Sequence, residues 1–381
     1  MIDFTQSEEQ VAIAGMVRAL MLEQVAPRTQ EIDELAEFPA WVAELFRGLD
    51  LFAVAVPEEH GGIDGSLTTV CVVVEQIARV SPACSMIVGV QSLGSTPITL
   101  FGSAEQKKNW LPAFAAGEKM VAFGLTEPDA GSDVKAMSTR AVRAGAGWRL
   151  NGRKCFISHA NIADLVVCFA KVNVEGRDQI TAFVVETLQP GFVVDKVEHK
   201  MGLRGSPTCS FVLEDAWVPQ ENLLGEVGQG LEILLATLHR SRICSAAQSL
   251  GVAQGALDLS VAYVKEREQF GRPLAKMQAV QMIVGGMVAQ TEAARCMVYA
   301  AAGTYDAGSA TIERFSAMAK LLASEAAMDV STSAVQIMGG YGYMVEYGVE
   351  QFMRDAKVFQ IFEGANELHR MAIARDLFAK G

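Results

Sequence analysis

The longest stretch without a proline limits what this chain can fold into. No proline lies between Pro219 and Pro273, and apolar residues recur at helical spacing after Gly225. The stretch can hold one helix of about 35 residues, roughly 50 Å long at 1.5 Å per residue. Helices of that length usually form long bundles. We therefore expect a C-terminal helical domain over residues 229–381.

Two other patterns precede this domain. Residues 1–120 also show helical spacing, and Ser7 followed three residues later by Gln10 predicts a capping box for the first helix. Residues 121–228 change to short alternating or β-branched runs such as ITAFVVET, which predict an antiparallel β domain. AGAG and the stronger pair Asn151-Gly152 predict turns. The predicted fold class is α+β, with an all-helical domain, a β domain and a second helical domain.

Charge and composition narrow the function. The net charge is −12 and no Lys/Arg run stands out, so no footprint for nucleic acid or an anionic membrane is present. Seven cysteines are scattered singly without a C-x-x-C pair, so we expect neither a metal site nor disulfides. The N-terminus lacks a basic leader, and we expect that no apolar run approaches the length of a membrane span. We therefore expect a cytoplasmic location.

The segment QIFEGANELHR places an acid, Glu363, among apolar residues. Glutamate is mostly solvated, so a surface or capping acid is one interpretation. The other rests on Phe359, Ile361 and Phe362, which crowd the acid, and on Gly364, which leaves room beside it. A carboxylate held there would lose hydration, and its pKa would rise toward neutrality, as a general base for a weakly acidic proton requires.

A second candidate segment is FGLTEPDAGSDVKA, residues 123–136. It is either a generic surface loop or a ligand-binding turn. In the second interpretation Gly131 permits close approach, and the hydroxyls of Thr126 and Ser132 hold a phosphate or a heteroaromatic edge.

Five ordered motifs then indicate a family: the segment just quoted, MGLRGSPTCSFVLEDAWVPQENLLG, YVKEREQFGRPL, QIMGGYGYMVEYGVEQFMRDAK and IFEGANE. Together they resemble the acyl-CoA dehydrogenase family along most of the chain. The resemblance implies a C-terminal four-helix bundle, FAD between the domains and an acyl-CoA thioester as substrate. It also implies an electron-transfer flavoprotein as electron acceptor. The implied assembly is a homo-oligomer, at least a dimer and more specifically a tetramer built as a dimer of dimers.

The resemblance also assigns residues to the site. Ser158 would donate to flavin N5, Phe156 stands where the family usually has Trp, and Ser132 also lies near the CoA arm. Arg267 and its neighbours in REQFG would reach the FAD of the adjacent subunit. The full set of implied cofactor contacts is Phe123, Thr126, Ser132, Phe156, Ser158, Arg267, Gln269, Phe270, Gln278, Gln336, Gly339 and Gly340. The implied substrate contacts are Ser132, Arg242 and Gly364.

Glu363 matches the family's catalytic carboxylate, which removes the α-hydrogen while the β-hydrogen leaves as hydride to flavin N5. Some branches place the base instead at the position of Ser241, but a serine cannot serve. Arg242 matches an arginine that organises the site, although a bundle ion pair would also explain it. Three residues depart from the usual pattern: Ala365, Gln351 and His239.

The substrate is only bounded by the resemblance. The segment SLGSTPI resembles the pocket wall of medium-chain members, and Ser85 occupies the region where a glutaryl branch carries an arginine. A second carboxylate on the substrate is therefore disfavoured. A short, medium or compact branched or cyclic acyl group fits. Two alternatives stay open: an acyl-CoA oxidase that uses O₂, and a non-catalytic CoA-ester-binding protein of the same fold.

Overall fold

The computed structural model describes residues 7–63 and 65–378, and its N-terminal part is helical. The first helix begins as predicted, because the Ser7 hydroxyl accepts from the Gln10 N–H and the Gln10 amide oxygen accepts from the Ser7 N–H, both at 3.1 Å. This capping box satisfies two backbone donors that the helix leaves free. The helices of this part are α1 (Glu8–Leu20), α2 (Thr29–Leu35), α3 (Ala40–Arg47), α4 (Leu67–Ala78), α5 (Pro82–Phe101) and α6 (Ala104–Ala115).

A β domain follows. Its strands are β1 (Val121–Gly124), β2 (Arg140–Ala144), β3 (Gly147–Ser158), β4 (Leu165–Val174), β5 (Arg177–Glu186), β6 (Phe192–Val197), β7 (Thr208–Pro219) and β8 (Leu223–Leu224). They form one sheet in the order β6-β7-β3-β2-β4-β5-β8, with β1 paired to β4. Most pairs are antiparallel, as predicted, but β4 runs parallel to both β1 and β2. These two parallel pairings join segments distant in sequence, so local turn signals could not predict them.

The stronger of the two turn predictions is wrong. Asn151 and Gly152 lie inside β3, where the register against β7 shifts between Leu150 and Gly152. The turn between β2 and β3 falls instead in AGAG, with Gly145 at φ 55°. Gly152 is needed for close approach, because a Cβ there would lie 2.3 Å from the Thr139 hydroxyl oxygen. The glycine marks a β-bulge and not a hairpin.

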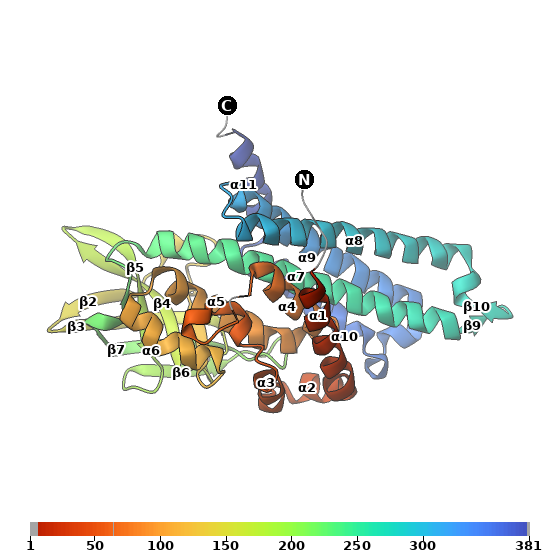
Figure 1. Ribbon diagram of the computed structural model, residues 1–381, viewed down its shortest axis with the longest axis horizontal. Coiled ribbons are helices and arrows are strands. Elements are labelled where there is room, and N and C mark those ends of the chain that lie inside the picture. The colour runs from red at the N-terminus through yellow and green to blue at the C-terminus, as the bar shows by residue number, and fades with distance from the viewer. Residues whose placement is uncertain (1–6, 64, 379–381) are drawn as a thin grey trace.

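The C-terminal part is a bundle of long helices, and α7 confirms the predicted long helix with 37 residues. The elements are α7 (Gly230–Glu266), α8 (Gln278–Asp306), α9 (Ile312–Met338), α10 (Val349–Phe359) and α11 (Asn366–Phe378), with a small hairpin of β9 (Glu268–Gln269) and β10 (Arg272–Pro273) between α7 and α8. Helices α7, α8 and α9 run along the long axis of the molecule (Figure 1). The β domain lies at one end of this axis and the β9–β10 hairpin lies at the other.

One apolar helix contradicts the expectation that no apolar run would approach a membrane span. By length and composition α5 could cross a membrane, since it has 20 residues and an 18-residue window within it has a mean hydropathy of 1.2. However, 72% of that window is buried inside the protein. Helix α5 packs against α4, α7 and β1, as the apolar core helix of a folded domain does.

Candidate active site

Glu363 lies in the turn between α10 and α11 and contacts α7 in the N-terminal third of that helix. Its Oε2 atom accepts a hydrogen bond of 2.7 Å from the hydroxyl of Ser241. The turn is tight, because Glu363 has a φ of 56° and Gly364 has a φ of 98°. A left-handed φ is uncommon for a residue with a side chain and often marks a functional position. Ser241 and Glu363, the two positions at which the resemblance places a base, are thus joined by a hydrogen bond.

The surroundings of Glu363 change its acidity. Burial raises the pKa of this carboxyl, whereas the hydrogen bond from Ser241 and the charges of Arg242 and Lys320 act in the opposite direction. Burial dominates, so the pKa lies above its ordinary value. A half-buried carboxylate with a raised pKa can accept a proton from a weak carbon acid.

Arg242 lies beside the same turn. Its Nε donates to the backbone oxygen of Glu363 at 3.2 Å. Within residues 7–63 and 65–378, no carboxylate forms an ion pair with Arg242, so the alternative of a bundle ion pair is not supported. Gly364 leaves little room, because a Cβ on it would lie 3.2 Å from Nε2 of His369 and 3.8 Å from Arg242. His239, the departure next to this site, is partly buried, and burial followed by the charge of Arg242 lowers its pKa.

A cavity of about 280 Å³ joins this turn to the β domain. Phe362, which precedes the base, and Ser158 at the end of β3 both line it. Met86 of α5 and the segment Lys200–Leu203 also line this cavity. Ser158 of the β domain and Phe362, the residue before Glu363, therefore line one cavity from different domains.

The loop after β1 is held by a buried ion pair. Lys154 Nζ lies 2.7 Å from Glu127 Oε1, and both side chains are nearly inaccessible. Burial alone would raise the pKa of Glu127, but the Lys154 charge and hydrogen bonds from Ser138 and Thr139 outweigh it and lower the pKa to about 2. Glu127 is thus a permanently ionised anchor that shapes the loop carrying Thr126 and Ser132.

Other predicted cofactor residues lie on the same domain. Phe156 has a left-handed φ of 58° at an irregularity of β3, and its side chain is 67% exposed. Among the described residues no aromatic ring pairs with this exposed ring. Ser132 is exposed and Thr126 is partly buried, whereas Phe123 packs its ring against Phe169 at 5.1 Å.

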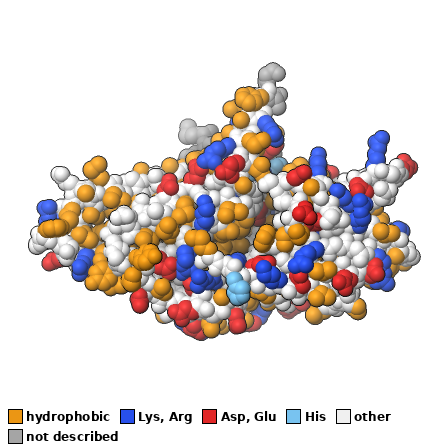
Figure 2. All heavy atoms as spheres, turned by 180° about the vertical axis from the view of Figure 1, so that it is seen from behind, with side chains coloured by type: hydrophobic (Ala, Val, Ile, Leu, Met, Phe, Trp, Pro, Cys, Tyr) orange, Lys and Arg blue, Asp and Glu red, His pale blue; other side chains and the backbone are white. Residues whose placement is uncertain are grey.

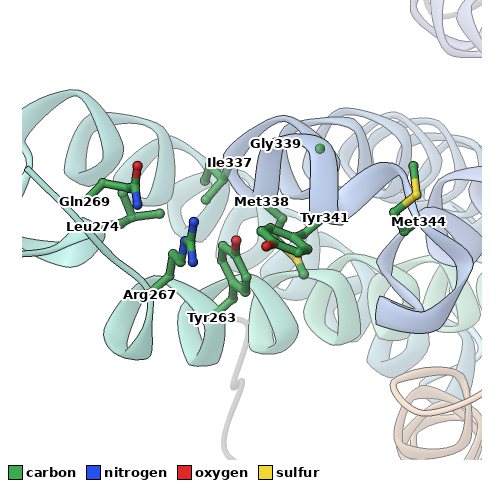
Figure 3. Close-up of a pocket in the computed structure, with 10 residues that line it drawn as sticks. Tyr263, Arg267, Gln269, Leu274, Ile337, Met338, Gly339, Tyr341 and Met344 are labelled. Carbon is green, nitrogen blue, oxygen red and sulfur yellow. The ribbon is translucent and has the colours of Figure 1, made fainter.

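The remaining predicted cofactor residues form a second group at the far end of the bundle. Arg267, Gln269, Gly339 and Gly340 line a cavity of about 430 Å³ (Figure 3). The Arg267 guanidinium lies 5.2 Å from the centre of the Tyr341 ring, and a cation over an aromatic face is attracted to it. Gln278 and Gln336 are exposed. Phe270 is 93% exposed at the tip of the hairpin.

The structure does not bring the two groups together within one chain. The hairpin lies at the end of the molecule opposite the β domain (Figure 1). Seen from behind, hydrophobic side chains gather over the half of the surface that belongs to this end of the bundle (Figure 2). Met282 is 77% exposed and Tyr343 is 76% exposed, alongside Phe270.

Two observations test whether these residues fit FAD. The exposed ring of Phe156 and the hydroxyl of Ser158, two residues further along β3, offer an aromatic face and a polar group to a flat polar ring system. Gly131, Gly339 and Gly340 have no atom within 4 Å of where a Cβ would stand, so a ligand backbone can approach them closely. The donors and open glycines fit a dinucleotide cofactor that spans two surfaces.

Two neighbours of the turn escaped prediction. Ser241 was considered only as a replaced base, and its hydrogen bond to Glu363 joins residues 122 positions apart. Nothing in the sequence around Lys320 of α9 distinguishes it from an ordinary exposed lysine on a helix. Its Nζ donates to the backbone oxygen of Gly364 at 2.7 Å.

The chain is similar to known proteins over most of its length. Models of the acyl-CoA dehydrogenase N-terminal, middle and C-terminal domains match residues 7–118, 122–216 and 228–378. A cyclohex-1-ene-1-carbonyl-CoA dehydrogenase of Syntrophus aciditrophicus is 42% identical over 375 residues, 97% of this chain and 90% of that protein. The butyryl-CoA dehydrogenase of Megasphaera elsdenii superposes with a TM-score of 0.95 at 38% identity, over 99% of this chain and 100% of that one.

Two further solved structures bear on cofactor and partner. A chain from work on the electron transferring flavoprotein of Acidaminococcus fermentans has a TM-score of 0.95 at 40% identity, over 98% of this chain and 99% of that one. An acyl-CoA dehydrogenase of Bacillus anthracis complexed with FAD has a TM-score of 0.93 at 33% identity, over 100% of this chain and 68% of that one. The chain belongs to the acyl-CoA dehydrogenase family, and FAD is the cofactor of this enzyme class, as predicted.

Proposed function

We propose that this enzyme removes one hydrogen from each of Cα and Cβ of a compact acyl-CoA thioester and releases the 2-enoyl-CoA, with Glu363 as the base. The observation that supports this proposal is the partly buried Glu363 carboxylate, which accepts a hydrogen bond from Ser241 and directly follows Phe362, a residue that lines one cavity together with Ser158. When bound, FAD supplies the acceptor for the β-hydrogen and two electrons. The protein supplies the orientation and the proton acceptor.

In this proposal Glu363 takes the α-proton while its own backbone N–H faces the thioester oxygen, where negative charge develops. A donor aimed at that oxygen acts most strongly in a site that excludes water. Arg242 and Gly364 hold the turn so that the carboxylate and the N–H keep one relative orientation. Removal of the proton and departure of the hydride thus depend on geometry more than on unusual reactivity.

The acyl group is proposed to be short or compact. Gln248 lies two turns beyond Ser241 on α7, and its amide donates to the Ser85 hydroxyl at 3.0 Å and contacts the Met86 sulfur at 3.4 Å. Gly89 accommodates this amide, since a Cβ there would lie 2.7 Å from it. The contact closes α5 against α7 beside the wall of the cavity that Met86 forms. We infer from this contact that the site takes a short or compact acyl group rather than a long chain.

The assembly is proposed to be at least a dimer, with a dimer of dimers as the full form. The two groups of predicted cofactor residues lie at opposite ends of one chain, so a second copy must bring the hairpin of Phe270 and Arg267 to the β domain. The exposed apolar residues at this end support such a contact. We also propose the domain limits 1–120, 121–228 and 229–381, and an electron-transfer flavoprotein as electron acceptor.

Anaerobic mixing with acyl-CoA esters tests the proposed reaction. The wild-type protein should lose its yellow colour with a short, branched or cyclic ester, while Glu363→Gln should stay yellow and bind FAD normally. Normal bleaching of the glutamine variant would reject Glu363 as the base. Peroxide release, compared with reduction of an electron-transfer flavoprotein, distinguishes the oxidase alternative. A non-catalytic binding protein would bind the esters without any bleaching.

A further inference from the structure

Lys320 of α9 is a fully buried lysine that points at the turn carrying the base. Its ammonium group donates to the backbone oxygen of Gly364 at 2.7 Å and to Oδ1 of Asn366 at 3.1 Å. Both acceptors are neutral, and among the described residues no carboxylate forms an ion pair with it. Lysine is rarely buried without a paired charge, because the charged form loses its hydration. Core packing alone would be served better by methionine or leucine.

The turn that Lys320 contacts requires support. Glu363 and Gly364 both have a left-handed φ, a conformation that costs free energy for the glutamate. Ser324, one helical turn from Lys320, donates to Oδ1 of Asn366 at 3.1 Å and fixes the end of the turn. Lys320 donates a hydrogen bond to the carbonyl of Gly364, the residue that directly follows the base.

We propose that Lys320 is a positioning residue for the base. Its hydrogen bonds to Gly364 and Asn366 hold the left-handed turn, so the carboxylate of Glu363 stays against Ser241, and its positive charge stabilises the ionised carboxylate. This inference rests on the proposed function, because it presumes that Glu363 accepts the proton. A residue that acts through the turn need not contact the substrate.

The charges around Lys320 are consistent with this role. Burial lowers its pKa to about 7, Glu363 and Glu367 favour its charged form, and Arg242 opposes it. His369 of α11 also faces the cluster, but burial holds its pKa near 3, so it is neutral at ordinary pH. Lys320 therefore carries a charge below about pH 7 that lowers the pKa of Glu363, as the nearby guanidinium also does.

Three variants test the role of Lys320. Lys320→Met removes the donor and the charge at similar size, and Lys320→Arg keeps both. Ser331→Ala is the matched control, because Ser331 is a buried serine on α9 that donates only to a carbonyl of its own helix. Each is measured by hydrogen exchange of the peptide covering residues 360–366 and by the anaerobic bleaching rate as a function of pH.

We expect Lys320→Met to exchange the amides of this peptide faster than wild type, and its plateau bleaching rate to fall by about 100-fold, the order that a misplacement of about 1 Å costs. KM should change little, and the midpoint of the pH profile should move upward because the nearby cation is gone. Lys320→Arg should recover the exchange protection and most of the rate. Ser331→Ala should match wild type in both measurements.

The inference is overturned if Lys320→Met exchanges these amides at the wild-type rate and its pH profile does not move, even if its melting temperature falls. Equal effects in Ser331→Ala would also overturn it, because the role would then be general packing. If Lys320→Met does not fold, Lys320→Gln provides the same comparison with a polar group in the space. If none of the esters bleaches the wild-type protein, the proposed function fails. The hydrogen-exchange comparison still tests whether Lys320 holds the turn.

Discussion

Replacing Ser241 with alanine should raise the pH at which Glu363 becomes an effective base. The Ser241 hydroxyl donates to Oε2 at 2.7 Å, and a hydrogen bond to a charged group contributes about 1.5–3 kcal/mol. Glu363 is only half-buried, so water recovers part of this contribution, and we take about 1.4 kcal/mol as the net loss. One pKa unit corresponds to about 1.36 kcal/mol, so the pKa should rise by about one unit.

The assay is the anaerobic bleaching rate with a saturating acyl-CoA ester, followed across pH. The base acts as a carboxylate, so the rate rises with pH through its pKa. Loss of the donor disfavours the carboxylate and moves the midpoint upward. At a pH below the midpoint, the bleaching rate of Ser241→Ala should be about tenfold lower than that of wild type, because one pKa unit changes the ionised fraction by that factor. The plateau rate at high pH should change little.

Ser245→Ala is the matched control, because Ser245 is a buried serine one turn along α7 whose hydroxyl has no hydrogen-bond partner among the described residues. Its profile should superpose on that of wild type, and Ser241→Thr should restore the wild-type midpoint. A midpoint for Ser241→Ala that stays in place or moves downward would refute the reasoning.

Three further outcomes follow from contacts elsewhere. Lys154→Met leaves the buried Glu127 carboxylate unpaired and should lower the free energy of unfolding in urea by about 3–5 kcal/mol; a loss below 1 kcal/mol on the same scale would contradict this. Burial lowers the pKa of His369 to about 3, so the neutral imidazole stabilises the fold fully above about pH 6.5, and this stabilisation is lost as the pH falls toward 3. His369→Gln should therefore make the free energy of unfolding depend less on pH between about 6.5 and about 3. A difference between wild type and variant that stays constant over this range would contradict the prediction. Phe270→Ala should leave the melting temperature of the apoprotein unchanged, because the ring is 93% exposed, but should reduce FAD retention at low protein concentration; unaltered retention would argue against a hairpin contact with cofactor.

The elements that local pattern decides could be predicted from the sequence. Helix α7 required only an absence of proline and helical spacing, and the cap of α1 required only Ser7 and Gln10. The Asn151-Gly152 prediction failed because the close approach of Thr139, a tertiary contact, decides where a glycine is needed. Tertiary contacts of this kind leave no trace in a short sequence window.

The candidate site shows the same limit. Glu363 could be singled out because its apolar neighbours and Gly364 are adjacent in sequence, so desolvation could be inferred locally. The hydrogen bond from Ser241 could not, since 122 positions separate the two residues. Lys320 is 44 positions from Gly364, and only the packing of α9 against the turn brings its ammonium there. Residues that a motif marks could be named as candidates, whereas the contacts that Ser241 and Lys320 make with the turn could not be predicted.

The hairpin at the far end of the bundle has a genetic consequence. In the proposed dimer each chain lends Arg267 and Phe270 to its neighbour's site while it keeps its own Glu363. A mixed dimer of one chain altered at Glu363 and one altered at Arg267 would then combine both defects in one site and leave the other site intact. Two inactive proteins, unfolded and refolded together, should regain up to about a quarter of wild-type turnover, the share expected when half of the dimers are mixed and each carries one sound site.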